Sequence, residues 1–274
     1  MRAFVLRYPI WSFLVLNYLI SWTFLYPSYQ LILEQDTIPP MALIGIIGAY
    51  GPSIAAIIIQ AIISRKDLKV LLKKLLKVKT TWKLILFIII VPIFLYLLSY
   101  LVSAFLFEGN LHINWELGIS GISFWVLVAL PFGPMGEELG WRGFMLPKLL
   151  EKYSIFKSTL SVGLAWGIWH LASFSFPGAA IPEFLTVTIW SVGLFCLYTI
   201  SLSSIYTYVH LKCGGSVFYA IILHAFFNAA SNITFDFFEE TNDFKLLLSN
   251  YCLNIVFAAL LGYFLLLKKR SKGS

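Results

Sequence analysis

Long uncharged apolar runs constrain the fold of this chain more than any other feature of its sequence. The stretch between Lys83 and Glu108, for example, contains no charged residue and is rich in Leu, Ile and Phe. An apolar run of about 18 residues or more can cross the hydrocarbon core of a membrane as an α-helix. Only 12% of the chain is charged, against about a quarter in a soluble protein. The sequence therefore predicts a helical membrane protein, and it lacks the alternating segments of a membrane β-barrel.

The apolar pattern predicts one domain that extends over residues 1–274. No linker, repeat or low-complexity segment divides the chain. The expected fold class is all-α, a polytopic membrane protein with about eight transmembrane helices, one of which is broken at the candidate site. The predicted spans are 9–33, 40–63, 82–107, 118–147, 157–175, 183–207, 214–233 and 248–267.

The charges between these spans predict the orientation of the chain in the membrane. If the N-terminus is inside, every basic residue lies in an inside segment except Lys245, which lies outside, and Arg142, which lies within a span. Cytoplasmic loops carry an excess of Lys and Arg. We therefore expect an integral protein of the cell membrane or the endoplasmic reticulum with both termini in the cytoplasm. The same rule explains the net charge of +7, so nucleic acid is not expected as a partner.

One basic connector has the spacing of a helix. In residues 66–79, Leu, Val and Lys recur at helical intervals. This pattern is typical of an amphipathic helix that lies on the inner membrane surface. A basic connector without a special role explains the pattern equally well.

The fourth predicted span contains three ionisable residues, Glu137, Glu138 and Arg142. A charge at the bilayer centre costs about 2.5–3.5 kcal/mol on insertion scales, so such residues usually belong to a functional site. Pro131 and Pro134 precede them, and proline interrupts a helix. Because broken backbone at membrane depth must be buried in protein or line a wet cavity, the sequence predicts a cavity beside the glutamates.

The two glutamates differ in their expected partners. Glu138 and Arg142 are four residues apart, so they share one helix face and can pair. Glu137 is rotated away and is therefore the better candidate for chemistry. The alternative is that both glutamates only pair with Arg142.

Two of the four histidines lie deep in predicted spans. His170 and His224 are at about the same depth as Glu137, and Asn228 follows His224 by one helical turn. These four residues are therefore expected to converge. For His112 and His210, which are near span ends or in a loop, a solvated surface position is expected.

The residue types leave two chemical schemes open. Glutamate and histidine can together activate a water molecule, and histidine and asparagine N–H groups can stabilise an oxyanion. Two histidines, a glutamate and an asparagine can also bind a metal. An HExxH motif is absent, and the spacing of the three cysteines, Cys196, Cys213 and Cys252, indicates neither a disulfide framework nor a zinc framework.

Three motifs together, EExxxR, an aromatic residue followed by xxxH, and HxxxN, resemble the CAAX protease and bacteriocin-processing family. Within it, the chain is most similar to the type II CAAX prenyl endopeptidases, the Ras-converting-enzyme group. The motifs occupy the core region 133–228, and the layout of eight spans covers the rest of the chain. The resemblance implies an intramembrane endopeptidase that acts on a prenylated or membrane-associated peptide within the lipid bilayer.

The resemblance also implies roles for individual residues. In that family the residues that match Glu137 and His170 activate water, and those that match His224 and Asn228 form the oxyanion hole. Glu138 and Arg142 carry over as structural support. No cofactor is expected, and zinc is not favoured.

One position departs from the family pattern. Trp166 stands where phenylalanine is commoner, and it carries over as an aromatic wall that supports the site.

A different class of function remains open. The chain can be a non-catalytic membrane protein of the same family, with a role in bacteriocin immunity or as a scaffold, or it can be a transporter. Transporters also place broken helices and charges at the middle of the membrane. Against a transporter, the sequence shows no internal repeat and no second broken helix at a matching position.

Overall fold

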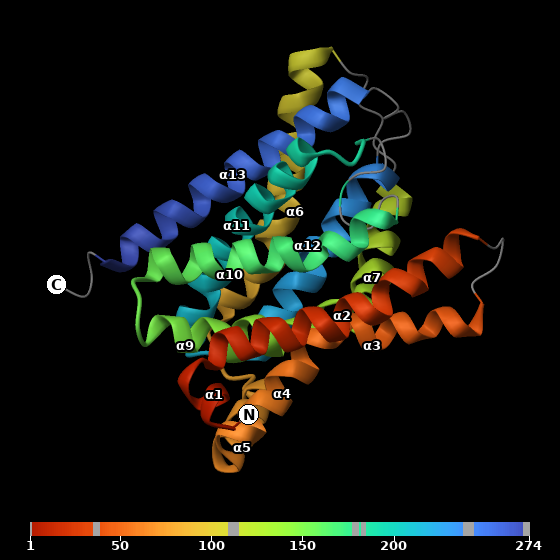
Figure 1. The fold of residues 1–274 in the computed structure, drawn as a ribbon. Coiled ribbons are helices and arrows are strands. Elements are labelled where there is room, and N and C mark those ends of the chain that lie inside the picture. The colour runs from red at the N-terminus through yellow and green to blue at the C-terminus, as the bar shows by residue number, and fades with distance from the viewer. Residues whose placement is uncertain are drawn as a thin grey trace.

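The computed structural model describes residues 2–34, 39–108, 115–176, 181, 185–237 and 244–270. Within these ranges the chain is helical and has no strand, so the predicted all-α class is confirmed. The helices form a bundle in which α6 (Trp82–Phe107), α11 (Ile189–Lys212) and α13 (Phe244–Arg270) pack against one another (Figure 1).

The remaining elements pack against this group or against one another. Helix α12 (Val217–Phe237) packs against α6 and α7, and α10 packs against α11. The other bounds are α1 (Arg2–Arg7), α2 (Pro9–Leu33), η1 (Pro40–Ile44), α3 (Gly45–Ala49), α4 (Gly51–Ile63), α5 (Arg65–Lys73), η2 (Lys74–Leu76), α7 (Trp115–Phe132), α8 (Pro134–Glu138), the π-helix η3 (Leu139–Met145), α9 (Leu146–Leu150), α10 (Ile155–Trp169) and η4 (His170–Ser175).

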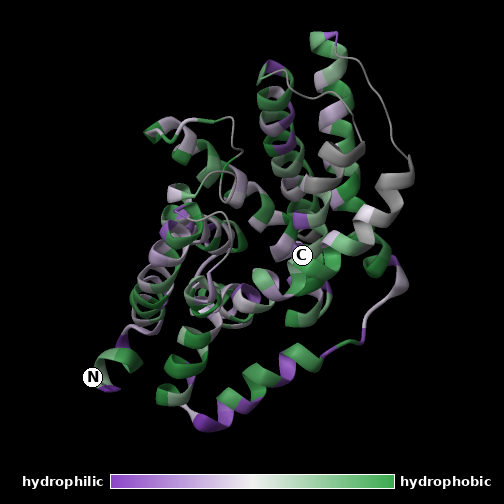
Figure 2. Cartoon of the chain, turned by 90° about the vertical axis from the view of Figure 1, so that its right-hand side faces the viewer, coloured by the Kyte–Doolittle hydropathy of each residue, from purple (hydrophilic) through white to green (hydrophobic). Residues whose placement is uncertain are grey.

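Each predicted span corresponds to one helix or to a run of consecutive helices. Helices α2 and α6 coincide with the predicted spans 9–33 and 82–107 from end to end. Within the described residues, four helices are long and apolar enough to cross a membrane, and a bent pair raises the number to five. These long helices are mostly hydrophobic along their length (Figure 2). A polytopic membrane protein is therefore supported, but the predicted number of about eight spans is not confirmed.

The bent pair corresponds to the second predicted span, which is not one continuous helix. Residues Pro40–Ala49 and Gly51–Ile63 meet at an angle of 51°. Pro52 stands at the start of α4, where its missing N–H cannot continue the hydrogen bonds of the preceding turn. The chain thus contains a second break in addition to the predicted one.

Helix α2 is held to α10 by side chains along one of its faces. Tyr18 Oη donates to the carbonyl of Ala165, and Trp22 Nε1 donates to the carbonyl of Trp169, both at 2.9 Å. Trp169 Nε1 donates in turn to Ser21 Oγ at 2.6 Å. Hydrogen bonds between helices are one of the forces that associate membrane helices, and here they fix the helix that directly precedes His170.

The basic connector 66–79 folds in part as the predicted helix. Ser64 Oγ accepts from the backbone N–H of Asp67 at 3.2 Å and caps α5. Helix α5 lies at the same end of the molecule as the N-terminus (Figure 1). Its position on a membrane surface remains a prediction.

The prediction of a solvated surface position for His210 was wrong, because this residue is buried and only 7% exposed. Gly214 and Gly215 both have positive φ, at 62° and 82°, and the turn that they form folds back over the ring. The N–H of Gly215 donates to the carbonyl of His210 at 2.8 Å. His112 lies outside the described residues.

Candidate active site

The predicted break before the two glutamates is confirmed. Helix α7 ends at Phe132, Gly133 has φ −164° and ψ −73°, and α8 begins at Pro134. Pro134 occupies the first turn of the new helix, where its missing N–H costs nothing. The π-helix η3 follows directly and carries Arg142. Such π segments often occur at functional sites.

Two glycines let this broken segment lie directly on the bent pair α3–α4. A Cβ on Gly136 would lie 2.5 Å from the carbonyl oxygen of Ala49, and one on Gly140 would lie 2.6 Å from that of Pro52. The pair forms a GxxxG spacing, which allows membrane helices to approach closely. The second break of the chain therefore supports the segment that carries the glutamates.

The predicted pairing of Glu138 with Arg142 is present and completely buried. Arg142 Nη1 donates to both oxygens of Glu138, at 2.8 and 3.1 Å, and Nη2 donates to Ser203 Oγ at 3.2 Å. The guanidinium also lies 4.0 Å from the ring centroid of Tyr206 and 4.4 Å from that of Trp166. Cation–π contacts of this kind are strongest when they are desolvated. The buried positive charge of Arg142 is therefore stabilised by a carboxylate, a hydroxyl group and two aromatic rings.

His224 contacts the same carboxylate, which the sequence did not predict. His224 Nδ1 lies 2.8 Å from Glu138 Oε1. Since an ionised carboxylate only accepts hydrogen bonds, Nδ1 carries the proton. Neutral His224 then has a lone pair at Nε2, and protonated His224 donates from Nε2. By holding Nδ1, the Glu138 carboxylate leaves Nε2 of His224 available either to carry a proton or to donate a hydrogen bond to an oxyanion.

Glu137 has a different partner. Trp166 Nε1 donates to Glu137 Oε2 at 2.6 Å, and both residues are buried. Since Arg142 bonds Glu138, the two glutamates occupy separate environments, as predicted. The expected aromatic wall at position 166 is therefore also a hydrogen-bond donor.

His170 lies beside this pair at the C-terminal end of α10. Its Nδ1 is 2.9 Å from the carbonyl of Trp166, so Nδ1 donates and neutral His170 has a lone pair at Nε2. Its ring centroid is 6.0 Å from that of Trp166, the residue that binds Glu137. The His170 ring packs against the ring of Phe195 with a centroid separation of 5.0 Å. This orientation suits a proton acceptor.

Asn228 borders the other side of Glu137. A Cβ on Gly133 would lie 3.3 Å from Glu137 Oε1 and 3.7 Å from Asn228 Nδ2. The side-chain amide and the free edge of the carboxylate therefore face the same space at the break. The Trp166 ring connects this group to the second histidine, since its centroid is 5.3 Å from that of His224.

The structure thus brings all seven predicted site residues into one cluster from three stretches of the chain, residues 137–142, 166–170 and 224–228. Sequence reasoning missed Ser203 and Tyr206, which contact Arg142 from α11. Both are polar residues in an apolar helix, and their spacing of three places them on one face. Polar residues inside a span are the signal that would have identified them.

Among the described residues, no three His, Cys, Asp or Glu side chains form a group that could hold a metal ion. Three of the four candidate ligands already have one atom engaged, because Trp166 Nε1 binds Glu137, the Trp166 carbonyl binds His170 and Glu138 binds His224. The Oε1 edge of Glu137 and the Nε2 atom of His170 remain as groups that can face a reactant, and the amide of Asn228 lies beside that edge.

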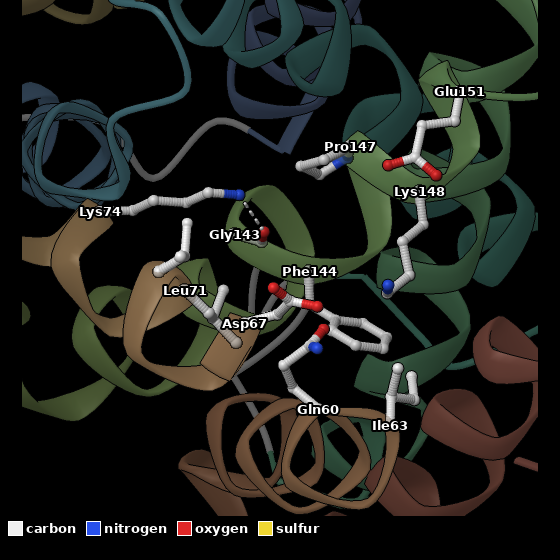
Figure 3. A pocket seen from close by; sticks show the side chains of 11 residues that line it. Gln60, Ile63, Asp67, Leu71, Lys74, Gly143, Phe144, Pro147, Lys148 and Glu151 are labelled. Carbon is white, nitrogen blue, oxygen red and sulfur yellow. Dashed lines mark hydrogen bonds between the residues drawn. The ribbon is translucent and has the colours of Figure 1, made fainter. Parts of the chain in front are cut away.

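A separate pocket of about 230 Å³ lies behind η3, between α4, α5 and α9 (Figure 3). Lys74 reaches across it and donates from Nζ to the carbonyl of Gly143 at 2.9 Å. Burial and the neighbouring Lys148 lower the pKa of Lys74. The lining contains none of the predicted site residues, so this pocket is distinct from the candidate active site.

Comparison with known proteins addresses the same part of the chain. Residues 119–230, which include every predicted site residue, match the family described as type II CAAX prenyl endopeptidase Rce1-like. This part of the chain resembles that family. The resemblance predicted from the three motifs is therefore confirmed.

A relative supports the same assignment. The chain is 31% identical over 127 residues to a protein of Methanococcus maripaludis named CAAX prenyl protease 2. The similar stretch covers 46% of this chain and 45% of that protein. The matching part of the chain thus spans less than half the length of this relative.

Proposed function

We propose that this protein is an intramembrane endopeptidase. It hydrolyses a peptide bond near the C-terminus of a prenylated CAAX-type protein or peptide. The observation that carries the proposal is the convergence of Glu137, His170, His224 and Asn228 at one helix break. The similarity to Rce1-like endopeptidases and to a protein named CAAX prenyl protease 2 supports it.

Glu137 and His170 activate the attacking water in this proposal. The water lies at the open Oε1 edge of Glu137 and gives one proton to the Glu137–His170 pair. Its oxygen attacks the carbonyl carbon of the scissile bond and forms a tetrahedral intermediate. When the C–N bond breaks, the same proton passes to the leaving amine, so the two side chains return to their starting state.

Asn228 and His224 stabilise the negative oxygen of this intermediate. Asn228 donates from its amide NH₂ group. His224 donates from Nε2 when it is protonated, and Glu138 holds its other ring nitrogen. Donors that face the developing charge in a water-poor site are usually the largest single contribution to catalysis.

The bilayer presents the substrate to the site. A prenyl chain inserts into lipid beside the helices, which brings the adjoining peptide to membrane depth. The chain is an integral membrane protein with both termini in the cytoplasm, where CAAX-type C-termini occur. Water alone completes the reaction, and no metal is required.

A transporter is the main competing function. The second break at Tyr50–Gly51 removes one argument against it, because a second broken helix does exist. However, that break packs against the first one through Gly136, so it supports the site. The Rce1-like match covers all four reactive groups, which favours the endopeptidase.

The proposal is tested with purified protein in detergent and a fluorogenic farnesylated CAAX peptide. We expect cleavage by the unmodified protein and none by Glu137→Gln, which keeps the shape of the side chain. The same peptide without its prenyl group should be cleaved more slowly. Absence of cleavage by a well-folded unmodified protein would refute the proposal.

A further inference from the structure

We infer that Trp166 is a positioning residue that directs Glu137 toward the attacking water through its indole N–H. This inference rests on the proposed function and deepens it. Trp166 Nε1 donates to Glu137 Oε2 at 2.6 Å, and the two residues are 3% and 4% exposed. One carboxylate oxygen is thereby held, and the other faces Gly133 and Asn228.

The donor is itself held rigidly. The Arg142 guanidinium stacks 4.4 Å from the centroid of the Trp166 ring. Tyr206 and His224 pack edge-on against the same ring, with centroid separations of 5.6 and 5.3 Å. The indole therefore cannot rotate without breaking contacts to three neighbours. The buried ion pair of Arg142 with Glu138 thus fixes, through this ring, the direction in which Glu137 presents its oxygen.

The indole N–H at position 166 distinguishes a residue that positions Glu137 from one that only provides an aromatic wall. Phenylalanine provides an apolar surface of similar position but has no N–H. The terminal torsion of a glutamate is broad and roughly two-fold, so a carboxylate without the indole bond can present either oxygen or an intermediate angle. A charge-assisted hydrogen bond is short and strong, and it selects one of these orientations before the substrate arrives.

The chain provides a matched control in Trp169. This residue is also buried, at 4% exposed, and its Nε1 also donates at 2.6 Å, but to Ser21 Oγ on α2. Both tryptophan rings pack against the His170 ring, with centroid separations of 6.0 Å for Trp166 and 4.7 Å for Trp169. The two residues therefore share ring type, burial and a histidine neighbour, and they differ in what the N–H binds.

The experiment replaces each tryptophan separately with 3-benzothienylalanine, in which sulfur stands in place of N–H and the shape is retained. Cleavage of the farnesylated peptide and the midpoint of thermal unfolding are measured for both variants. We expect both variants to lose thermal stability. For Trp166 we expect kcat to fall roughly 10- to 100-fold with KM unchanged, the range found when the hydrogen-bond partner that orients a metal ligand is removed. For Trp169 we expect kcat to be unchanged.

Trp166→Phe is a second test that needs only an ordinary amino acid. It should lower kcat at least as much as the benzothienyl substitution at position 166. Equal kcat in both benzothienyl variants, whether normal or reduced, would overturn the role of Trp166. Failure of the unmodified protein to cleave the peptide is a different result and would refute the proposed function itself.

Discussion

Removal of the negative charge of Glu138 should destabilise the protein far more than the same change at Glu137. Glu138→Gln and Glu137→Gln both keep side-chain volume and both remove one charge. Glu138 accepts three hydrogen bonds, two from Arg142 and one from His224, at 2.8 to 3.1 Å. Neither Glu138 nor Arg142 is exposed. Breaking a buried ion pair by removing one partner costs about 3–5 kcal/mol, because the other charge stays buried without compensation.

Glu137→Gln leaves a smaller deficit. The amide oxygen of glutamine can still accept the indole N–H of Trp166, so that donor keeps a partner. We expect a loss of about 1 kcal/mol, because the bond is retained but changes from a charge-assisted to a neutral hydrogen bond. Taking about 2–4 °C per kcal/mol for a chain of this size, Glu138→Gln should lower Tm by on the order of 10 °C and Glu137→Gln by only a few degrees.

A thiol-reactive dye can follow this unfolding in detergent. Cys213 is only 4% exposed, so it reacts when the bundle opens, while the less buried Cys196 and Cys252 set the background.

The double variant Glu138→Gln with Arg142→Met should be more stable than Glu138→Gln alone, because both charges are then absent. Equal Tm shifts at the two glutamates, or a double variant no more stable than the single one, would refute the assignment of Glu138 as the counter-ion.

Three further outcomes are expected. Asn228→Ala should lower kcat roughly 10²- to 10³-fold with little change in KM, and His224→Ala should be at least as severe; a rise in KM alone would place the asparagine in substrate binding. Active protein should contain no stoichiometric zinc by elemental analysis, and zinc that is removed together with activity by a chelator would contradict this. Reporter fusions after Arg65 and Lys272 should read cytoplasmic and one after Asp236 should not, whereas an outside signal at Lys272 would overturn the predicted orientation.

The sequence predicted best what depends on local order along the chain. Helices α2 and α6 end where their apolar runs end, and the break at Gly133 follows from Pro131 and Pro134. The pairing of Glu138 with Arg142 was also predictable, because both lie on one face within four residues. In these cases the cause and the consequence lie within one or two turns of the same helix.

Contacts between helices were not predictable in the same way. The bond from Trp166 to Glu137 and the bond from His224 to Glu138 depend on how each helix is rotated about its axis, which apolar periodicity determines only coarsely. The π-helix after Glu138 has no proline or other marker of its own. The sequence placed His210 at the surface, but the turn at Gly214 and Gly215 folds back over its ring. The position of a span boundary does not predict how the following turn folds.

The close approach at Gly136 and Gly140 extends the set of residues that selection must preserve. Backbone carbonyls of Ala49 and Pro52 occupy the space that any side chain at the two glycines would need. The orientation of both carboxylates therefore depends in part on the bend between α3 and α4, which contributes no reactive atom. In a map of mutational tolerance, Gly136 and Gly140 should be about as intolerant as the acids themselves. Libraries that alter substrate choice should leave these two glycines unchanged and vary residues elsewhere around the site.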